Sequence, residues 1–167
     1  VSILAGGLAG WQAEQRPLQS GAVAAPEEGE FNVKFDAGVV ARRTEVLVAS
    51  HEGGAQVVDA RPAARFNGEV DEPRPGLKRG HIPGSLNMPW GSLVEQGALK
   101  SPEALRALFA QQGIDPQRPV IASCGSGVTA AVVLLALTEL GAQDLRLYDG
   151  AWSEWGSRDD LPIAPDA

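Results

Sequence analysis

The single cysteine of the chain, Cys124, lies in the run PVIASCGSGVTA (residues 119–130), which is typical of a short apolar strand, a tight loop and a helix. Gly125 and Gly127 have no Cβ atom, so the loop backbone can close tightly around the thiol. A thiol at such a junction faces loop amides and a helix N-terminus, whose partial positive charges favour the thiolate. A lone cysteine is more often a small buried apolar residue, but this position favours a nucleophile.

The residue that follows this loop argues against one class of cysteine enzyme. Phosphatases built on a cysteine, a loop and a helix need an arginine six residues after the cysteine to hold phosphate, and Ala130 stands there instead. The span Cys124–Thr129 is also shorter than related phosphatase loops. A smaller loop suits a sulfur atom better than a phosphate group, so we expect sulfur chemistry.

The loop CGSGVT (residues 124–129) resembles the active-site loop of the mercaptopyruvate sulfurtransferases, a branch of the rhodanese superfamily. Three further stretches fit that family and follow its order, namely VVDAR (57–61), GHIPGS (80–85) and YDGAWSEW (148–155). The match runs from about residue 31 to residue 155. Four motifs in the family's order are a specific signal, whereas any one of them alone would be weak.

The resemblance implies a covalent cycle at Cys124. The thiolate would take sulfur from 3-mercaptopyruvate, release pyruvate and pass the sulfur to cyanide, thioredoxin or a small thiol, with no cofactor. It also implies that Ser126 belongs to a Ser-His-Asp relay whose other members lie in an upstream domain. The persulfide would be cradled by loop residues Gly125, Gly127, Val128 and Thr129, and we expect the Thr129 hydroxyl to cap the next helix.

Two arginines, Arg65 and Arg74, stand nine residues apart in the run RFNGEVDEPR. Exposed arginines are usually solvated surface residues. This spacing, however, matches the two arginines that hold the substrate carboxylate in the resembled family, and a guanidinium group suits two-point contact with a carboxylate. We therefore expect both to bind the donor.

Three other functions stay open on the sequence. A thiosulfate sulfurtransferase usually has basic residues after its cysteine, where this chain has Gly125 and Ser126. A rhodanese module that only binds partners often lacks the cysteine. A cysteine hydrolase would need His81 as its base, but GHIPG favours a structural turn.

Composition narrows the classes further. Hydrophobic residues make up 44% of the 167 residues and the formal net charge is −7, which argues against nucleic acid as a general partner. We find no apolar run of membrane-spanning length, no signal peptide and no cluster with metal-ligand spacing. One cysteine is compatible with a reducing compartment, so we expect a cytoplasmic protein without a membrane partner.

Short apolar strands that alternate with helices predict an α/β fold, a rhodanese-like parallel sheet with helices on both faces. We expect a long loop over 68–84. The predicted strands are 31–35, 56–59, 119–123 and 145–148. The predicted helices are 44–50 with Thr44 as its cap, 62–66, 101–112 with Ser101 as its cap, and 128–140.

An internal repeat suggests a second domain. The run ILAGGLAGW (3–11) aligns without a gap on LYDGAWSEW (147–155). We expect residues 1–21 to be the C-terminal remnant of an upstream rhodanese domain, 22–30 to be a linker, and 31–167 to be the catalytic domain. The strand and helix of residues 1–11 should then pack on that other domain.

Overall fold

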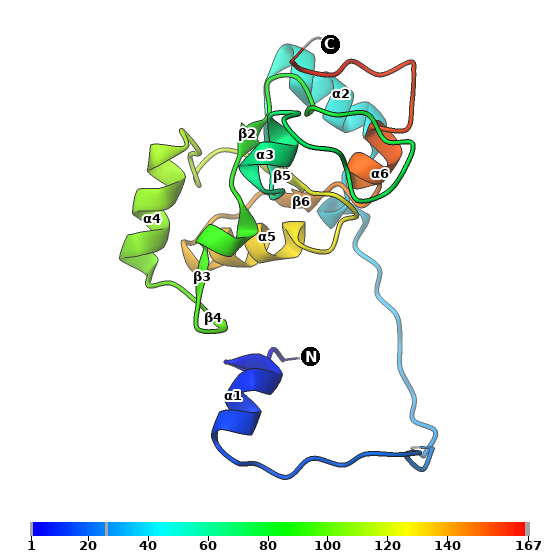
Figure 1. Cartoon of the computed structure of the whole chain (residues 1–167), viewed down its shortest axis with the longest axis vertical. Coiled ribbons are helices and arrows are strands. Elements are labelled where there is room, and N and C mark those ends of the chain that lie inside the picture. The colour runs from blue at the N-terminus through cyan, green and yellow to red at the C-terminus, as the bar shows by residue number, and fades with distance from the viewer. Residues whose placement is uncertain (1, 26, 166–167) are drawn as a thin grey trace.

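A parallel sheet of four strands in the order β2-β1-β5-β6 forms the centre of the computed structural model, which describes residues 2–25 and 27–165 (Figure 1). Val1, Pro26 and residues 166–167, which the domain prediction includes, lie outside the described residues. The strands are β1 (Gln56–Asp59), β2 (Leu86–Asn87), β5 (Val120–Ser123) and β6 (Leu145–Leu147). Every residue of β1 and β5 is buried, as expected for strands covered on both faces.

Helices cover both faces of this sheet, which confirms the predicted fold class. The helices are α2 (Arg43–Glu52), α3 (Ala63–Phe66), α4 (Pro102–Gln111), α5 (Ala130–Glu139) and α6 (Ala151–Trp155). Apart from the N-terminal helix, the remaining elements are 3-10 turns at Ala37–Val39 and Trp90–Ser92, and a small hairpin of β3 (Val94–Glu95) and β4 (Ala98–Leu99).

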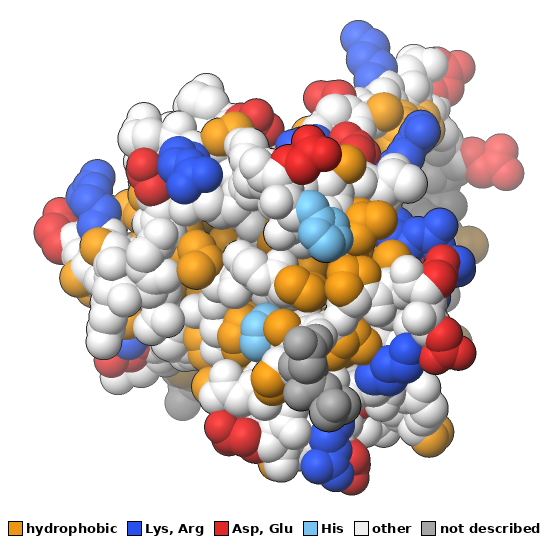
Figure 2. All heavy atoms as spheres, turned by 90° about the horizontal axis from the view of Figure 1, so that it is seen from above, with side chains coloured by type: hydrophobic (Ala, Val, Ile, Leu, Met, Phe, Trp, Pro, Cys, Tyr) orange, Lys and Arg blue, Asp and Glu red, His pale blue; other side chains and the backbone are white. Residues whose placement is uncertain are grey.

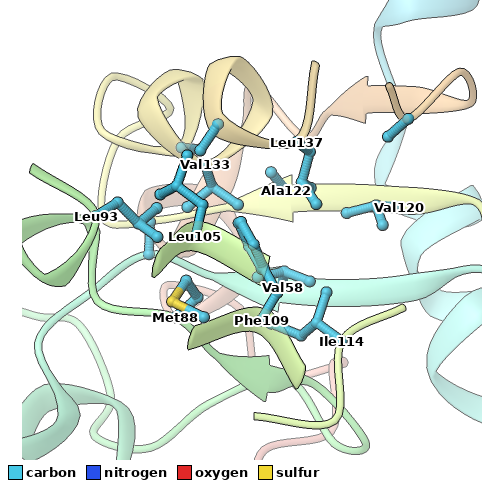
Figure 3. Close-up of a cluster of buried hydrophobic side chains, with 14 of the residues drawn as sticks. Val58, Met88, Leu93, Leu105, Phe109, Ile114, Val120, Ala122, Val133 and Leu137 are labelled. Carbon is cyan, nitrogen blue, oxygen red and sulfur yellow. The ribbon is translucent and has the colours of Figure 1, made fainter. Parts of the chain in front are cut away.

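Two apolar clusters lie on opposite faces of the sheet because successive strand side chains point to opposite sides. Val58 faces α4 and α5, where it packs in one cluster with Phe109 and Val133 (Figure 3). Its neighbour Val57 belongs to the second cluster, which includes Trp155 of α6. Strand β1 is thus held in place by apolar packing on both faces of the sheet.

The helix starts test the capping predictions. The N–H of Ala104 donates to Ser101 Oγ over 3.3 Å, so the predicted cap of α4 is confirmed. The predicted cap at Thr44 is wrong, because α2 begins at Arg43. There the N–H of Arg42 donates to the carboxylate of Glu45 over 2.8 Å, which caps the helix two residues before the predicted cap.

The predicted strand at residues 31–35 is wrong. Phe31 and Phe35 are 83% and 75% exposed, and the segment is extended chain without a strand neighbour. The sheet edge beside β6 is instead met by the next residues along the chain, where the N–H of Ala41 donates to the carbonyl of Leu147 over 2.8 Å. Alternating apolar residues predict a strand only where an edge is free to pair with them.

The N-terminal helix α1 (Gly7–Ala13) lies apart from the sheet, beyond the β3–β4 hairpin (Figure 1). No residue of Gly7–Ala13 is buried. Its turn meets the hairpin at one point, since a Cβ atom on Gly97 would lie 3.3 Å from the carbonyl oxygen of Gly6. The predicted strand before α1 is not formed in the described residues 2–4.

Two local features of α1 nevertheless recur at α6, although the residues before the helices differ, Gly6 with φ 76° and Gly150 with φ −57°. The first residues of the two helices, Gly7 and Ala151, both have positive φ angles, 55° and 52°. In both helices the indole N–H donates to a proline carbonyl a few residues on, from Trp11 to Pro17 over 2.9 Å and from Trp155 to Pro162 over 2.8 Å. The sequence repeat therefore corresponds to a shared positive φ angle at the first helical residue and a shared indole contact.

Basic and acidic side chains are intermixed over the face seen from above, with apolar side chains between them (Figure 2). No patch of a single sign covers that face. Within the described part of the chain, no helix is long and apolar enough to cross a membrane.

Candidate active site

Cys124 follows the last residue of β5 at the carboxyl end of the parallel sheet, where ligands of such sheets bind. Its side chain is 1% exposed and packs in the same apolar cluster as Ala130, the first residue of α5. The ten-residue helix α5 thus points its N-terminus at the loop 125–129. The partial positive charge of that end stabilises an anion held in the loop.

The start of α6 anchors this loop from one side. The N–H of Trp152 donates to the carbonyl of Cys124 over 2.9 Å, and the N–H of Ser153 donates to the carbonyl of Gly125 over 3.0 Å. Because C=O and N–H point in opposite directions across a trans peptide, the amides of Gly125 and Ser126 point away from α6. Among the described residues, no protein acceptor receives a hydrogen bond from the five amides of 125–129. Those donors can bind a sulfur anion.

Both loop glycines closely approach neighbouring residues. Gly127 has φ +84°, and a Cβ atom there would lie 3.1 Å from the carbonyl oxygen of Asp149. At Gly125 a Cβ atom would lie 2.9 Å from Arg65 Nη2. The predicted loop therefore closes against two neighbours that leave little room for a side chain at either glycine.

A pocket of about 220 Å³ opens at the loop and brings together six of the eight predicted site residues. Ser126 lines it from the exposed side of the loop, whereas Val128 is 74% exposed and lies outside it. Gly127 is buried and also does not line it. The lining residues are Arg65, Glu72, Pro73, Arg74, Leu77, Cys124, Gly125, Ser126 and Thr129.

Both predicted arginines are held in place. Arg65 donates through Nε to Glu72 Oε1 over 3.1 Å and through Nη2 to the second oxygen of the same carboxylate. Arg74 Nη1 donates to Ser153 Oγ over 2.9 Å. Arg65 is therefore held on the pocket wall by a buried carboxylate, and the exposed Arg74 is held there by one hydroxyl.

Sequence reasoning missed the buried ion network beneath Arg65. Arg61, 1% exposed, donates to Asp59 through Nη2 over 2.7 Å and to Glu72 through Nη1 over 2.7 Å. Its guanidinium carbon lies 4.3 Å from the centre of the Trp152 ring, a cation–π contact. Asp59 and Arg61 stand at the end of a buried strand in VVDAR, and charges there are a signal that could have found them.

Two smaller expectations need correction or comment. The Thr129 hydroxyl does not cap α5, because Thr129 has a helical backbone (φ −75°, ψ −16°) and makes no side-chain cap bond. His81 Nδ1 lies 2.8 Å from the carbonyl oxygen of Phe66, and its ring stacks on Phe66 at 3.8 Å. His81 does not line the pocket of Cys124, so a hydrolase would lack its base there.

Neither the pocket beside α2 nor the acidic, histidine and cysteine side chains elsewhere in the described residues provide a second candidate active site. The pocket of about 390 Å³ beside α2 is lined by Thr44, Val48, Arg146 and neighbours and contains no nucleophilic thiol. Across residues 2–25 and 27–165, no three His, Cys, Asp or Glu side chains are grouped so as to hold a metal ion.

The parallel sheet and the cysteine loop at its carboxyl end are those of a rhodanese-type domain. Residues 43–158 match the rhodanese-like domain family, so the chain belongs to that family. The 3-mercaptopyruvate sulfurtransferase of Escherichia coli (strain K12) is 62% identical over 165 residues, which are 99% of this chain and 58% of that protein. The thiosulfate sulfurtransferase of Gallus gallus is 39% identical over 160 residues, 95% of this chain and 54% of that protein.

A solved structure agrees with these relatives. The crystal structure of SseA from Escherichia coli, described with the catalytic mechanism of 3-mercaptopyruvate sulfotransferases, is similar with a TM-score of 0.79 and 59% identity. The match covers 92% of this chain and 56% of that one. The chain thus spans little more than half the length of the proteins it resembles.

Proposed function

We propose that this chain is the catalytic portion of a 3-mercaptopyruvate sulfurtransferase. The observation that carries the proposal is the buried thiol of Cys124 in a pocket with two hydrogen-bonded arginines, beside loop amides that have no protein acceptor among the described residues. The E. coli relative that is 62% identical bears this activity in its name.

In the first half of the cycle the Cys124 thiolate attacks the sulfur atom of 3-mercaptopyruvate. An S–S bond forms while the donor's C–S bond breaks, and the bonding pair leaves on carbon as the enolate of pyruvate. The enolate then takes up a proton. Sulfur moves in this way without an external oxidant or reductant, and the cycle uses no cofactor.

Arg65 and Arg74 bind the donor carboxylate at the pocket wall, which places the donor sulfur near Cys124. Ser126 acts at the leaving enolate as one member of a relay. Its hydroxyl makes no side-chain hydrogen bond within residues 2–25 and 27–165, which leaves it available to partners contributed by an upstream domain.

In the second half of the cycle an acceptor attacks the outer sulfur of the Cys124 persulfide and regenerates the thiolate. Until then the persulfide is stabilised by the amides of Gly125 to Thr129 and by the N-terminus of α5. Cyanide, thioredoxin or a small thiol serves as the acceptor, and the reducing cytoplasm is the compartment we propose.

Thiosulfate is the second candidate donor, because the Gallus gallus relative is named a thiosulfate sulfurtransferase. Gly125 and Ser126 stand where such enzymes usually have basic residues, so the dianion should be the poorer donor here. A rhodanese module that only binds partners would have no use for the fixed arginines beside the thiol.

We further propose that residues 1–21 belong to an upstream rhodanese unit, that 22–30 form the linker, and that 31–167 form the catalytic unit. The positive φ angle at the first residue of both α1 and α6, and the matching indole contacts to proline carbonyls, support this assignment. The 167-residue chain alone should be less active with mercaptopyruvate than the same chain joined to an upstream rhodanese unit. Full activity of the isolated chain would contradict this.

A donor comparison tests the proposed function. With cyanide as acceptor, kcat/KM for thiocyanate formation should be higher from 3-mercaptopyruvate than from thiosulfate, and pyruvate should appear in equal amount with thiocyanate. A preference for thiosulfate would favour the second candidate. Thiocyanate formation from neither donor by the chain joined to an upstream rhodanese unit would reject both.

A further inference from the structure

Ser153 joins the donor-binding arginine to the cysteine loop. Its Oγ accepts a hydrogen bond from Arg74 Nη1 over 2.9 Å and donates to the carbonyl of Gly125 over 2.6 Å. The contact with Arg74 joins residues far apart in the sequence, since Ser153 lies on α6 and Arg74 lies in the long loop after α3. A single hydroxyl therefore connects two walls of the pocket.

The Ser153 hydroxyl fixes a side chain that little else restrains. Arg74 is exposed, and its only side-chain hydrogen bond among the described residues is the one to Ser153. A long arginine side chain loses much rotamer freedom on being held in one geometry. An acceptor already fixed by the loop removes part of that cost before the donor arrives.

We propose that Ser153 is a positioning residue that aims Arg74 at the donor carboxylate and sets its place relative to Cys124. The inference rests on the proposed function, in which Arg74 binds that carboxylate. Ser153 touches neither reacting atom, so it acts through Arg74 and not in the chemistry of sulfur transfer.

The backbone allows this role to be separated from support of the loop. Without the hydroxyl, the carbonyl of Gly125 still accepts the N–H of Ser153, and the carbonyl of Cys124 still accepts the N–H of Trp152. Ser153→Ala should therefore leave the loop anchored while freeing Arg74.

The test is steady-state kinetics with both donors for Ser153→Ala, with Ser153→Thr as the variant that keeps a hydroxyl. For Ser153→Ala we expect KM for 3-mercaptopyruvate to rise about tenfold, the loss typical of one hydrogen bond to a charged group. The kinetics with thiosulfate should change less than twofold, and Ser153→Thr should recover most of the mercaptopyruvate affinity. Ser157→Ala, which removes an exposed hydroxyl bonded to the carbonyl of Glu154, is the matched control.

Equal losses with both donors would assign Ser153 to loop support and overturn the inference. So would an unchanged KM for mercaptopyruvate in Ser153→Ala while Arg74→Ala raises it. If Arg74→Ala itself leaves KM unchanged, the carboxylate role of Arg74 fails and the inference fails with it. Wild-type protein that transfers sulfur from neither donor would reject the proposed function first.

Discussion

Gly125 and Arg65 pack so closely that a Cβ atom at position 125 would lie 2.9 Å from Arg65 Nη2. The far end of an arginine can usually move aside at little cost. Here it cannot do so freely, because the guanidinium is bound to both oxygens of the buried Glu72 carboxylate. The cysteine loop and the carboxylate-binding arginine therefore set each other's positions.

Gly125→Ala should displace Arg65 and weaken donor binding. A side chain forced off its rotamer costs roughly 0.5–1.5 kcal/mol, so we expect kcat/KM for mercaptopyruvate to fall roughly two- to tenfold. The control is Gly91→Ala, because a Cβ atom on Gly91 would meet nothing within 4 Å. Wild-type kinetics in Gly125→Ala would show that Arg65 is freer than its contacts indicate.

Loss of Arg74 should affect the two donors differently. If it binds the carboxylate of 3-mercaptopyruvate, Arg74→Ala should reduce kcat/KM for that donor by about 2 kcal/mol in transition-state stabilisation, the lower end expected for a charged partner that is partly solvated. Thiosulfate turnover should fall less. Arg106→Ala, on the exposed side of α4, controls for loss of surface charge. Equal losses for both donors would argue against carboxylate recognition.

Removal of the Glu72 charge should cost both stability and activity. Glu72 accepts from Arg61 and Arg65, and taking one partner out of a buried ion network destabilises proteins by about 3–5 kcal/mol. Glu72→Gln should lower the urea midpoint and, at temperatures where it stays folded, raise KM for mercaptopyruvate. Glu69→Gln, at an exposed position, should do neither. An unchanged urea midpoint in Glu72→Gln would contradict the network's structural role.

Tyr148 offers a direct spectroscopic test because it is the only tyrosine of the chain. Burial, followed by its hydrogen bond to Glu154 and the charge of that carboxylate, raises the pKa of Tyr148 well above its ordinary value. Folded protein should therefore form phenolate only well above pH ~10, and Glu154→Gln should lower the pKa. Ultraviolet absorbance during alkaline titration measures both. An ordinary midpoint in folded wild-type protein would refute the buried contact.

The raised pKa of Tyr148 also predicts how the stability of the fold changes with pH. Above the ordinary tyrosine pKa the unfolded chain loses its phenol proton while the folded protein keeps it. The contribution of the protonated Tyr148 to the free energy of unfolding is therefore fully present at neutral pH. It is lost as the pH rises through the alkaline range. Urea unfolding at increasing alkaline pH should show less of this decline in Glu154→Gln.

The sequence predicted the elements whose signals are local. Strand 56–59 is a continuous buried run, and Ser101 before Pro102 marks a helix start by its own chemistry. The alternation at 31–35 misled because pairing depends on a free neighbour, and the β6 edge is met by Val40 and Ala41. Local patterns specify what a segment favours, while the partners decide what it forms.

The candidate site divides in the same way. Cys124 and its loop could be recognised because the residues are contiguous. Glu72 and Ser153 could not, because their roles depend on contacts with Arg61 and Arg74 that the fold alone creates. Ser153 in particular lies far along the chain from Arg74, and nothing in the run AWSEW indicates an arginine partner.

Mass spectrometry of the intact protein tests the central claim most directly. After incubation with 3-mercaptopyruvate, the intact protein should gain the mass of one sulfur atom, and digestion should place that sulfur on the peptide that contains Cys124. Cyanide should remove the sulfur and yield thiocyanate. Cys124→Ser should show no gain and no turnover. Thiocyanate formation by Cys124→Ser, or turnover by the wild type without any sulfur-bearing intermediate on Cys124, would contradict the account.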